Sequence, residues 1–430
     1  MPEQVTSLAS TEKARKYLYV INELTKTWRD VSFTLSNFKR ATGRYINGGR
    51  QAIIPLETAT SGAFRFSDPG EAPSEAGTAT YDEAVIDFTT MSTSIEYDWH
   101  AKLAGQTDKQ SFIQLRTKAI ADAVEVMGYR WSHAIFMPKT NAVARVKTAN
   151  ITPGVHQLYK EGETTGAGAG GTFGARYIFK KGYLAASANT TTKVCEKGFD
   201  GWADSVDRVN DKITTGGLLS STIANDDYLF WGTKDRTSKG RGLTGLPMIV
   251  NDGVDYAVFE GRDRTVAGNE DWQATVSRSF GSGNIELEMI NQSINLERKL
   301  PGVHTDVVMY GLKVQRLHFQ QMATLRRAML PVSDINGAVY NGGFKALPVD
   351  YGDRQLAAMA NVEIPDNVMY GLSWDALALA MLSEPVWIDE GEGQFKHIPD
   401  TFSWKAHLAG VGQLVSKLPA AHWLTTGITP

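Results

Sequence analysis

The sequence predicts a mixed α+β fold, and three patterns along its 430 residues carry that prediction. Residues 84–99 read as a strand, because apolar and polar side chains alternate over residues 91–99 as expected of a strand that buries one face. Residues 109–137 form a long helical pattern without proline, and residues 285–327 read as helix, strand and helix. Hydrophobic residues make up 42% of the chain and charged residues 21%, which excludes a disordered or collagen-like protein. The length allows one large architecture or two to three modules.

The first hundred residues divide into two blocks of opposite charge. Residues 1–50 hold nine basic and four acidic side chains, a net charge of +5, whereas residues 51–100 hold one basic and nine acidic side chains, a net charge of −8. Two interpretations stay open. The blocks are either two solvated faces, whose exposed ion pairs contribute only ~0–1 kcal/mol each, or surfaces through which neighbouring copies of the chain contact each other.

The acidic block also predicts a long hairpin arm. Residues 91–99 alternate with a period of two, Gln51–Leu56 and Ala63–Phe66 look extended, and residues 67–77 are dense in turn formers. An isolated two-stranded hairpin is marginally stable in water, so the arm is expected to lie on another surface. In a homo-oligomer, that surface belongs to the next subunit.

The helix predicted over 109–137 follows Thr107, which resembles a capping box together with Gln110, and Pro138 is expected to end it. Apolar residues cover most of its circumference, with Ala123 and Val126 on one apolar face. At ~1.5 Å rise per residue the helix would span over ~40 Å, so it is expected to lie centrally, as a spine.

The rest of the chain alternates weaker signals. Residues 139–225 read mainly as loops and hairpin tips, apart from a short amphipathic helix over 200–213 with Trp202, Val206 and Val209 on one side. Helices are predicted over 285–300, through Leu287, Ile290 and Ile294, and over 312–327. The predicted strands are 305–310, 344–349, 368–372, 386–388 and a long strand region over 402–424.

A search for chemistry along the sequence returns no catalytic, cofactor-binding or metal-binding motif. The glycine-rich run 166–171 lacks the ending of a phosphate loop, the eight histidines show no metal-ligand spacing, and Cys195 lies in no nucleophile motif. The adjacent acids Asp226-Asp227 and Asp389-Glu390 read as turn residues. We therefore expect a protein that is not an enzyme and that needs no cofactor or metal.

Charge and composition narrow the remaining classes. The formal net charge of −3 provides no overall positive field that would hold nucleic acid. A single cysteine cannot form an internal disulfide, and no run approaches the ~18 apolar residues of a membrane span. Residues 1–10 do not resemble a secretory signal, so we expect synthesis in a cytoplasm.

Four segments carry a resemblance to a known family. They are Gly245–Gly253 (GLPMIVNDG), Gly261–Arg264 (GRDR) with the following Trp272-Gln273, Leu287–Asn291 (LEMIN) and the closing stretch Trp404–Ile428. Together with the order of basic opening, acidic hairpin, long helix and helix–strand–helix block, these segments resemble tailed-bacteriophage major capsid proteins of the Hong Kong 97 fold. The resemblance covers most of the chain, and its motifs are loose.

The resemblance implies a division of the chain into the parts of that fold. Residues 1–47 would be an N-terminal arm and 48–100 an extended loop. Residues 101–224, with the spine helix 109–137, and residues 376–430 would form the peripheral domain, and residues 225–375 the axial domain. Because residues 51–100 contain no lysine, the isopeptide cross-link that some members form from this loop is not expected. Because the loop begins near residue 48, we do not expect a long N-terminal scaffolding segment in this chain; earlier cleavage of a precursor would leave the same residue count.

The resemblance also implies the partners. The chain would assemble into hexamers and pentamers of an icosahedral shell in the virion, enclose double-stranded DNA without sequence specificity, and meet a portal protein, with separate scaffolding and decoration proteins as further partners. Candidate inter-subunit contacts in the basic and acidic blocks are Arg15, Lys16, Arg40, Arg44, Arg65, Asp68, Glu71, Glu75, Asp82 and Glu83. Two alternatives remain at this point: an encapsulin-like nanocompartment shell and an unrelated enzyme.

Overall fold

A computed structural model gives the fold of the chain. It describes residues 46–47, 51–59, 80–98, 109–137, 142–160, 174–178, 183–187, 201–217, 223–231, 242–278, 280–326, 347–351, 354–388, 396–397 and 403–429. The described chain combines helices and sheets, so the mixed class predicted from the sequence is confirmed at that level.

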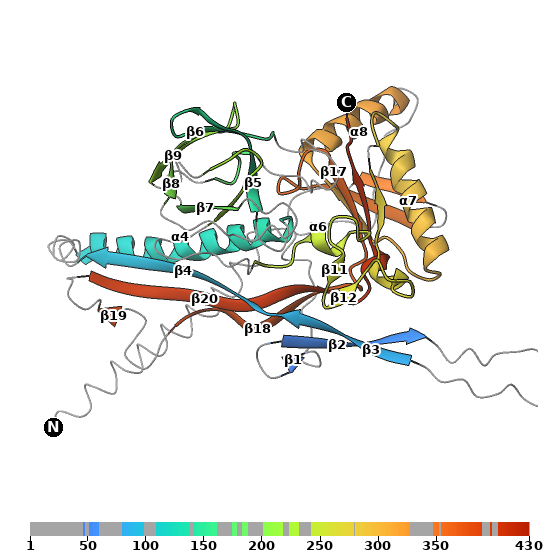
Figure 1. Cartoon of the computed structure of the whole chain (residues 1–430), viewed down its shortest axis with the longest axis horizontal. Coiled ribbons are helices and arrows are strands. Elements are labelled where there is room, and N and C mark those ends of the chain that lie inside the picture. Colours follow the sequence, from blue (N-terminus) through green and yellow to red (C-terminus); the bar gives the residue numbers. More distant parts are fainter. Residues whose placement is uncertain are drawn as a thin grey trace, which may run out of the picture.

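A sheet that runs along one long helix forms the centre of the molecule (Figure 1). Strand β20 (Ser403–Ser416) pairs antiparallel with β4 (Thr89–Asp98), with β18 (Leu377–Trp387) and with the short β19 (Lys396–His397). Helix α4 (Lys109–Ile135) packs on β4 and β20. The predicted long helix and the predicted closing strand therefore meet in one unit.

Trp131 explains how closely α4 approaches this sheet. Its side chain is fully buried, and it faces Gly410 and Gly412 of β20. A Cβ atom added at Gly410 or Gly412 would lie 3.1 or 3.2 Å from carbons of the Trp131 ring. The two glycines thus leave the space that the indole fills, which gives the helix–sheet contact the density of a protein interior.

The second sheet has six strands in the order β13–β21–β17–β14–β16–β15. The strands span, in that order, Thr275–Ser277, Trp423–Thr426, Val368–Leu372, Val307–Tyr310, Arg354–Ala360 and Leu347–Tyr351. β13 pairs parallel with β21, as β14 does with β16, and the other neighbours are antiparallel. Helices α7 (Ile285–Lys299) and α8 (Leu312–Arg326) lie beside this sheet (Figure 1).

The alternation of β14 divides the hydrophobic core in two. Val308 and Tyr310 pack in one cluster with Met289 of α7. Val307 and Met309, which point to the opposite face, belong to the larger cluster that includes α4. Because all four β14 side chains are buried, the strand reads as a continuous apolar run and the sheet forms a wall between the two cores.

A closed barrel lies on the other side of α4 from β4 and β20 (Figure 1). Its strand order is β10–β5–β6–β9–β8–β7. The strands span, in that order, Tyr228–Trp231, Ala142–Thr152, Val155–Leu158, Lys212–Gly217, Gly201–Asp207 and Tyr183–Ser187. Trp231 of β10 lies under the Arg130 guanidinium of α4, 5.8 Å from its ring centroid, which joins barrel and helix.

Two smaller parts complete the described chain. Strands β1 (Ile46–Asn47), β2 (Gln51–Ala59) and β3 (Thr80–Asp87) form an antiparallel sheet that lies below β20 in Figure 1. Residues 242–274 connect the barrel to the six-stranded sheet. They contain helix α6, the hairpin β11–β12 and the short helix η2, at Leu246–Ile249, Val258–Phe259, Arg262–Asp263 and Glu270–Trp272, and a similar short helix, η3 (Pro419–Ala421), precedes β21.

Several predicted elements are confirmed. Helices α4, α7 and α8 occupy the ranges predicted for them to within two residues, and β14, β17 and β20 lie in predicted strands. The strand predicted over 84–99 is two strands, β3 and β4, which separate at Phe88 because β3 pairs with β2 and β4 with β20. The extended segment Ala63–Phe66, the glycine-rich run 166–171 and Pro138 lie outside the described residues.

The helix predicted over 200–213 is wrong. Strands β8 and β9 form an antiparallel hairpin there, with Val206 opposite Ile213. The turn between them is built by Asp207, whose carboxylate accepts hydrogen bonds from the backbone N–H groups of Val209 and Asn210. Such a local side-chain bond favours a turn over a helix, and it leaves Val209 90% exposed rather than packed beside Trp202.

Two predicted apolar faces also need correction. Val126, placed on a buried face of α4, is 40% exposed, and Leu287 of α7 is 56% exposed. α7 instead buries Ile285, Met289 and Leu296, a row at steps of four and seven that continues the face toward β14. The elements were identified by their apolar periodicity, but the choice between adjoining faces depended on neighbours far away in the sequence.

Candidate functional site

The first candidate is the ribbon of β2 and β3, which we call the arm. The two strands pair from Gln51 opposite Asp87 to Ala59 opposite Thr80, with one irregularity after Glu57. Ile54, Ala84 and Ile86 are buried at the root of the arm and belong to the main core. At the other end of β3, Tyr81, Asp82 and Glu83 are all exposed, and the Tyr81 side chain is 73% accessible to solvent.

The β11–β12 hairpin contacts β3 at Val85, near the root of the arm, and at Asp82, near its exposed end. The backbone N–H of Val85 donates to the carbonyl of Glu260 over 3.1 Å. The Arg262 guanidinium lies 3.3 Å from the Asp82 carboxylate and 5.5 Å from the centroid of the Trp272 ring. These contacts fix the direction in which the arm leaves the body, because they join β3 to a segment that is itself packed in the core.

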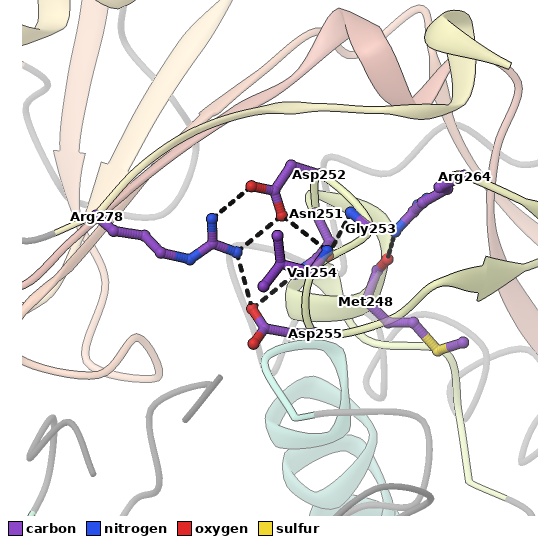
Figure 2. Close-up of polar contacts among 8 residues, drawn as sticks. All are labelled: Met248, Asn251, Asp252, Gly253, Val254, Asp255, Arg264 and Arg278. Atoms are coloured by element: carbon purple, nitrogen blue, oxygen red, sulfur yellow. Dashed lines mark hydrogen bonds and ion pairs between the residues drawn. The ribbon is translucent and has the colours of Figure 1, made fainter. Parts of the chain in front are cut away.

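That segment is organised around a buried arginine, Arg264 (Figure 2). Its guanidinium donates to the carbonyls of Met248 and Ile249 over 2.8 and 2.9 Å, and it lies 4.4 Å from the centroid of the Phe259 ring. Burial lowers the pKa of Arg264 to about 10, so the side chain stays charged at neutral pH. Its role is to close the backbone of α6 against the β11–β12 hairpin, since the two carbonyls lie at the end of that helix.

Gly253 allows the chain to turn beside Arg264. Its φ of +95° lies in the region that glycine adopts without strain, and a Cβ atom there would lie 3.1 Å from the Arg264 Cβ. The Asn251 side chain accepts the Gly253 N–H over 2.9 Å, which closes the turn (Figure 2). The segment Gly245–Gly253 (GLPMIVNDG), one of those that carry the family resemblance, therefore forms helix α6 and the turn that follows it.

A second cluster ties the same turn to the six-stranded sheet. Arg278, directly after β13, donates to both carboxylate oxygens of Asp252 and lies 3.2 Å from Asp255 (Figure 2). Burial alone would raise the pKa of Asp252, but the hydrogen bonds from Arg278 and from the Val254 N–H lower it below its ordinary value. The same carboxylates raise the pKa of Arg278. Arg278 and Asp252 therefore form a bidentate ion pair that holds the turn beside β13, and Asp255 contacts the same guanidinium.

One buried serine–histidine pair bears on the question of catalysis. Ser416 and His422 are fully buried, and their Oγ and Nε2 atoms are 3.4 Å apart. The other ring nitrogen, Nδ1, accepts the Ser373 N–H over 3.2 Å, so the proton sits on Nε2 and points toward Ser416. A base must accept the proton of the serine rather than donate its own, so this pair lacks the arrangement of a nucleophile and its base.

The geometry of the described part of the chain also bears on metal sites and on membrane-spanning helices. It contains no group of three or more histidine, cysteine, aspartate or glutamate side chains placed to hold a metal ion. No helix within it combines the length and the apolar character that crossing a membrane requires.

The inter-subunit contact residues predicted from the sequence lie mostly outside the described residues. Only Asp82 and Glu83 are described, and both are exposed on β3. Asp82 pairs with Arg262 of its own chain, whereas the remaining candidates, in the two charged blocks, receive no structural placement. Sequence reasoning missed Arg262 and Glu260, which lie some 180 residues away from β3 and which no local pattern could connect to it.

No protein-family model matches the sequence, and no curated protein matches it. Solved structures that match it include phage capsids. The cyanophage A-1(L) capsid asymmetric unit matches 92% of this chain and 93% of its own at 11% identity, with a TM-score of 0.49. The satellite phage P4 procapsid, which includes the size determination protein, covers 99% and 98% at 12% identity and a TM-score of 0.40. The capsid of Myoviridae phage XM1 covers 92% of both chains at 7% identity and a TM-score of 0.40.

Proposed function

We propose that this chain is the major capsid protein of a tailed bacteriophage, which assembles into hexamers and pentamers of an icosahedral shell around double-stranded DNA. The observation that carries the proposal is the arm. A two-stranded ribbon is marginally stable by itself in water, and three consecutive residues of β3 are exposed at its outer end. An arm of this kind needs a second surface, and a head-to-tail contact between identical subunits supplies one and closes into rings when the rotation permits.

The body suits the same function. In the division we propose, α4 with the β4–β20–β18 sheet is the peripheral domain and the six-stranded sheet with α7 and α8 is the axial domain. β21 would then join the axial sheet, because it pairs with β13 and β17. A shell subunit performs no turnover, so its function is distributed over surfaces, and each contact can be modest when several neighbours hold one subunit.

Under this proposal, the acidic block 51–100 lies against basic residues of a neighbouring subunit. The N-terminal residues Arg15, Lys16, Arg40 and Arg44 are candidates for that contact, with Arg65, Asp68, Glu71 and Glu75 on the arm side. DNA would be contained rather than gripped, since the chain has a formal net charge of −3. A portal protein and separate scaffolding and decoration proteins would complete the virion.

Electron microscopy of the purified full-length protein tests the proposal. We expect closed shells built of five- and six-membered rings, and nuclease-protected double-stranded DNA in the particles recovered from lysed host cells. A matched variant replaces residues 60–79 with a short Gly-Ser turn and keeps the buried root residues Ile54, Ala84 and Ile86. It should fold and remain unassembled.

Two outcomes would contradict the proposal in different ways. A full-length protein that stays monomeric under all assembly conditions would remove the shell function. Shells that enclose a defined protein and no DNA would instead identify the encapsulin-like alternative.

A further inference from the structure

The barrel carries a basic hollow that the proposed function has not used. It has a volume of about 510 Å³ and lies where the β5–β6 hairpin meets the turn between β8 and β9. Its lining includes three exposed lysines, Lys147, Lys160 and Lys212, and two apolar side chains, Ile151 and Val209. Ile151 is 48% exposed and Val209 is 90% exposed, so the hollow offers both positive charge and apolar contact.

The walls of the hollow are fixed by hydrogen bonds. The Gln157 side-chain amide donates to the carbonyls of Asn210 and Asp211 over 2.6 and 3.1 Å, which ties the turn to β6. Asp207 holds the same turn from the other side by accepting the Asn210 N–H over 3.1 Å. Val209 is therefore presented outward on a rigid tip, and a partner would find the surface already formed.

We propose that this hollow receives the acidic arm of a second copy of the chain. The inference rests on the proposed function and names the surface that the arm meets. Residues 51–87, from the start of β2 to the end of β3, hold one basic and seven acidic side chains, a net charge of −6, which complements the three lysines. At the exposed end of β3, Tyr81 and Glu83 share one face of the strand, so the arm presents an aromatic ring next to a carboxylate, as the hollow presents apolar side chains next to ammonium groups. Asp82, on the other face, contacts Arg262 of its own chain.

The arrangement of the molecule makes this contact intermolecular. In Figure 1 the barrel strands β6, β8 and β9 lie above α4, whereas β2 and β3 lie below β20, on the opposite side of the helix and its sheet. β3 therefore does not reach the hollow of its own chain. A contact between two different surfaces of identical molecules is head-to-tail, which is the type that generates rings.

Nucleic acid is the competing occupant, and the observations favour the arm. Three lysines would neutralise about three phosphates, which supports only weak and salt-sensitive binding. A phosphate backbone also makes no apolar contact with the exposed Ile151 and Val209, whereas a tyrosine ring can pack against them and bury apolar surface on both sides. Each copy of the chain carries one acidic arm and one hollow, so the two occur in equal number, as a repeating assembly requires.

Zero-length carbodiimide cross-linking of the assembled full-length protein tests the contact. Particles are assembled from a mixture of ¹⁴N- and ¹⁵N-labelled chains, so that a cross-link between copies contains both isotopes. We expect mixed-isotope links that join the peptide holding Asp82 and Glu83 to peptides holding Lys147, Lys160 or Lys212. Assembled particles whose mixed links all avoid these lysines would overturn the inference while leaving the shell function in place.

Charge exchange provides a second test with matched controls. The triple variant Lys147→Glu, Lys160→Glu, Lys212→Glu should raise the protein concentration needed for half-maximal assembly about tenfold or more, and the three Lys→Arg changes should leave it near the wild-type value. Adding Glu83→Lys to the triple Glu variant should restore part of the loss. If the triple variant assembles normally but retains less DNA, the hollow binds nucleic acid and the arm contact is wrong. If no variant and no wild-type protein assembles, the proposed function itself fails.

Discussion

Strands β3 and β4 are separated by Phe88 alone, yet they pack differently: β4 lies in the body of the molecule and β3 lies in the arm. Along β4, Met91, Thr93 and Ile95 are half-buried while the residues between them are exposed, the alternation of a strand with one face on the core. β3 keeps this alternation only at its root, with Ala84 and Ile86 buried. At residues 81–83 both faces of β3 are exposed, so this part of the strand gains little burial within one molecule.

The difference shows which strand buries its apolar face within one copy of the chain. β4 is covered by α4 and paired along its length with β20, so its apolar face is satisfied inside the chain. β3 has β2 as its pairing partner, and beyond the root its residues 81–83 are exposed, with Arg262 in contact with Asp82. The body is therefore stabilised by burial within one copy, and the arm is expected to gain its burial from another.

The largest expected effect comes from removing the centre of the body. Trp131→Ala empties a fully buried site between α4 and β20 and should lower the free energy of unfolding by about 3–5 kcal/mol, whereas Tyr81→Ala on the arm should change it by less than about 0.5 kcal/mol. Denaturant unfolding of the unassembled protein measures both. An equally large loss for Tyr81→Ala would mean that the arm already packs within its own chain, and the comparison would break.

The second effect compares two arginines near the root of the arm. Arg264→Ala leaves the carbonyls of Met248 and Ile249 without their donor in a buried site and should lower the free energy of unfolding by about 2–4 kcal/mol. Arg278→Ala removes a partly exposed ion pair and should lower it by about 1 kcal/mol or less. Thermal unfolding of the two variants side by side gives the order. Equal losses would show that the Arg264 contacts are replaced by water.

Local patterns in the sequence were sufficient for the helices. α7 begins where the Asn284 side chain accepts the Leu287 N–H over 3.2 Å, and it ends before Pro301-Gly302, so both of its ends are encoded within a few residues. α4 and α8 likewise carry their apolar rows within a single segment. Each of these signals is local, which is why composition and spacing alone identified the elements.

The barrel was missed because its pairing is not local. Tyr228 of β10 pairs with Arg145 of β5 and with Ser187 of β7, so neighbours in the barrel come from positions far apart in the chain. Its short strands each hold too few residues for an alternation to be distinguished from a helical pattern, and the error over 200–213 arose in this way.

The candidate site likewise combines residues with a local signal in the sequence and residues without one. The exposed acids of the arm were predicted, because charge blocks are visible in the sequence. The lysines of the hollow were not, because Lys147, Lys160 and Lys212 form no charge run and are brought together only by the pairing of β5, β6 and β9. Nor does a sequence tell which of Arg262 and Arg264, two residues apart, is fully buried and which reaches toward the arm.

Acid provides a further way to separate body and arm. Burial lowers the pKa of His422 to about 3, so this side chain is neutral in the folded protein and takes up a proton on unfolding below its ordinary value of 6.5. The stabilisation is complete above pH 6.5 and is lost as the pH falls toward 3, by about 1.4 kcal/mol per pH unit. Between pH 6.5 and 5 the body should lose about 2 kcal/mol through His422.

His422→Gln isolates this contribution, because a glutamine can accept the Ser373 N–H and donate to Ser416 as the histidine does. Urea unfolding at pH 7 and pH 5 should show a smaller pH dependence in the variant, with the remainder due to groups such as His133, whose pKa burial lowers to about 4. The described strands of the arm contain no histidine, so loosening in mild acid should begin in the body. A variant as acid-sensitive as the wild type would place the sensitivity elsewhere.

The smallest effect concerns the link between body and arm. Asp82→Asn removes a pair whose aspartate is 52% exposed, so it should lower the free energy of unfolding by less than about 1 kcal/mol, and less still at high salt. Arg262→Ala should cost more, because the Arg262 side chain is 11% exposed and stacks on Trp272.

Hydrogen exchange at the Val85 N–H, which is bonded to Glu260, reports this link directly. In unassembled protein, Asp82→Asn should speed that exchange by a factor of about five or less, as expected for a weak exposed pair. In assembled particles the same substitution should have almost no effect on the exchange if a neighbouring subunit covers the arm, because the protection then comes from burial between copies. A variant that exchanges equally fast in both states would mean that the root of the arm is held only by its own body.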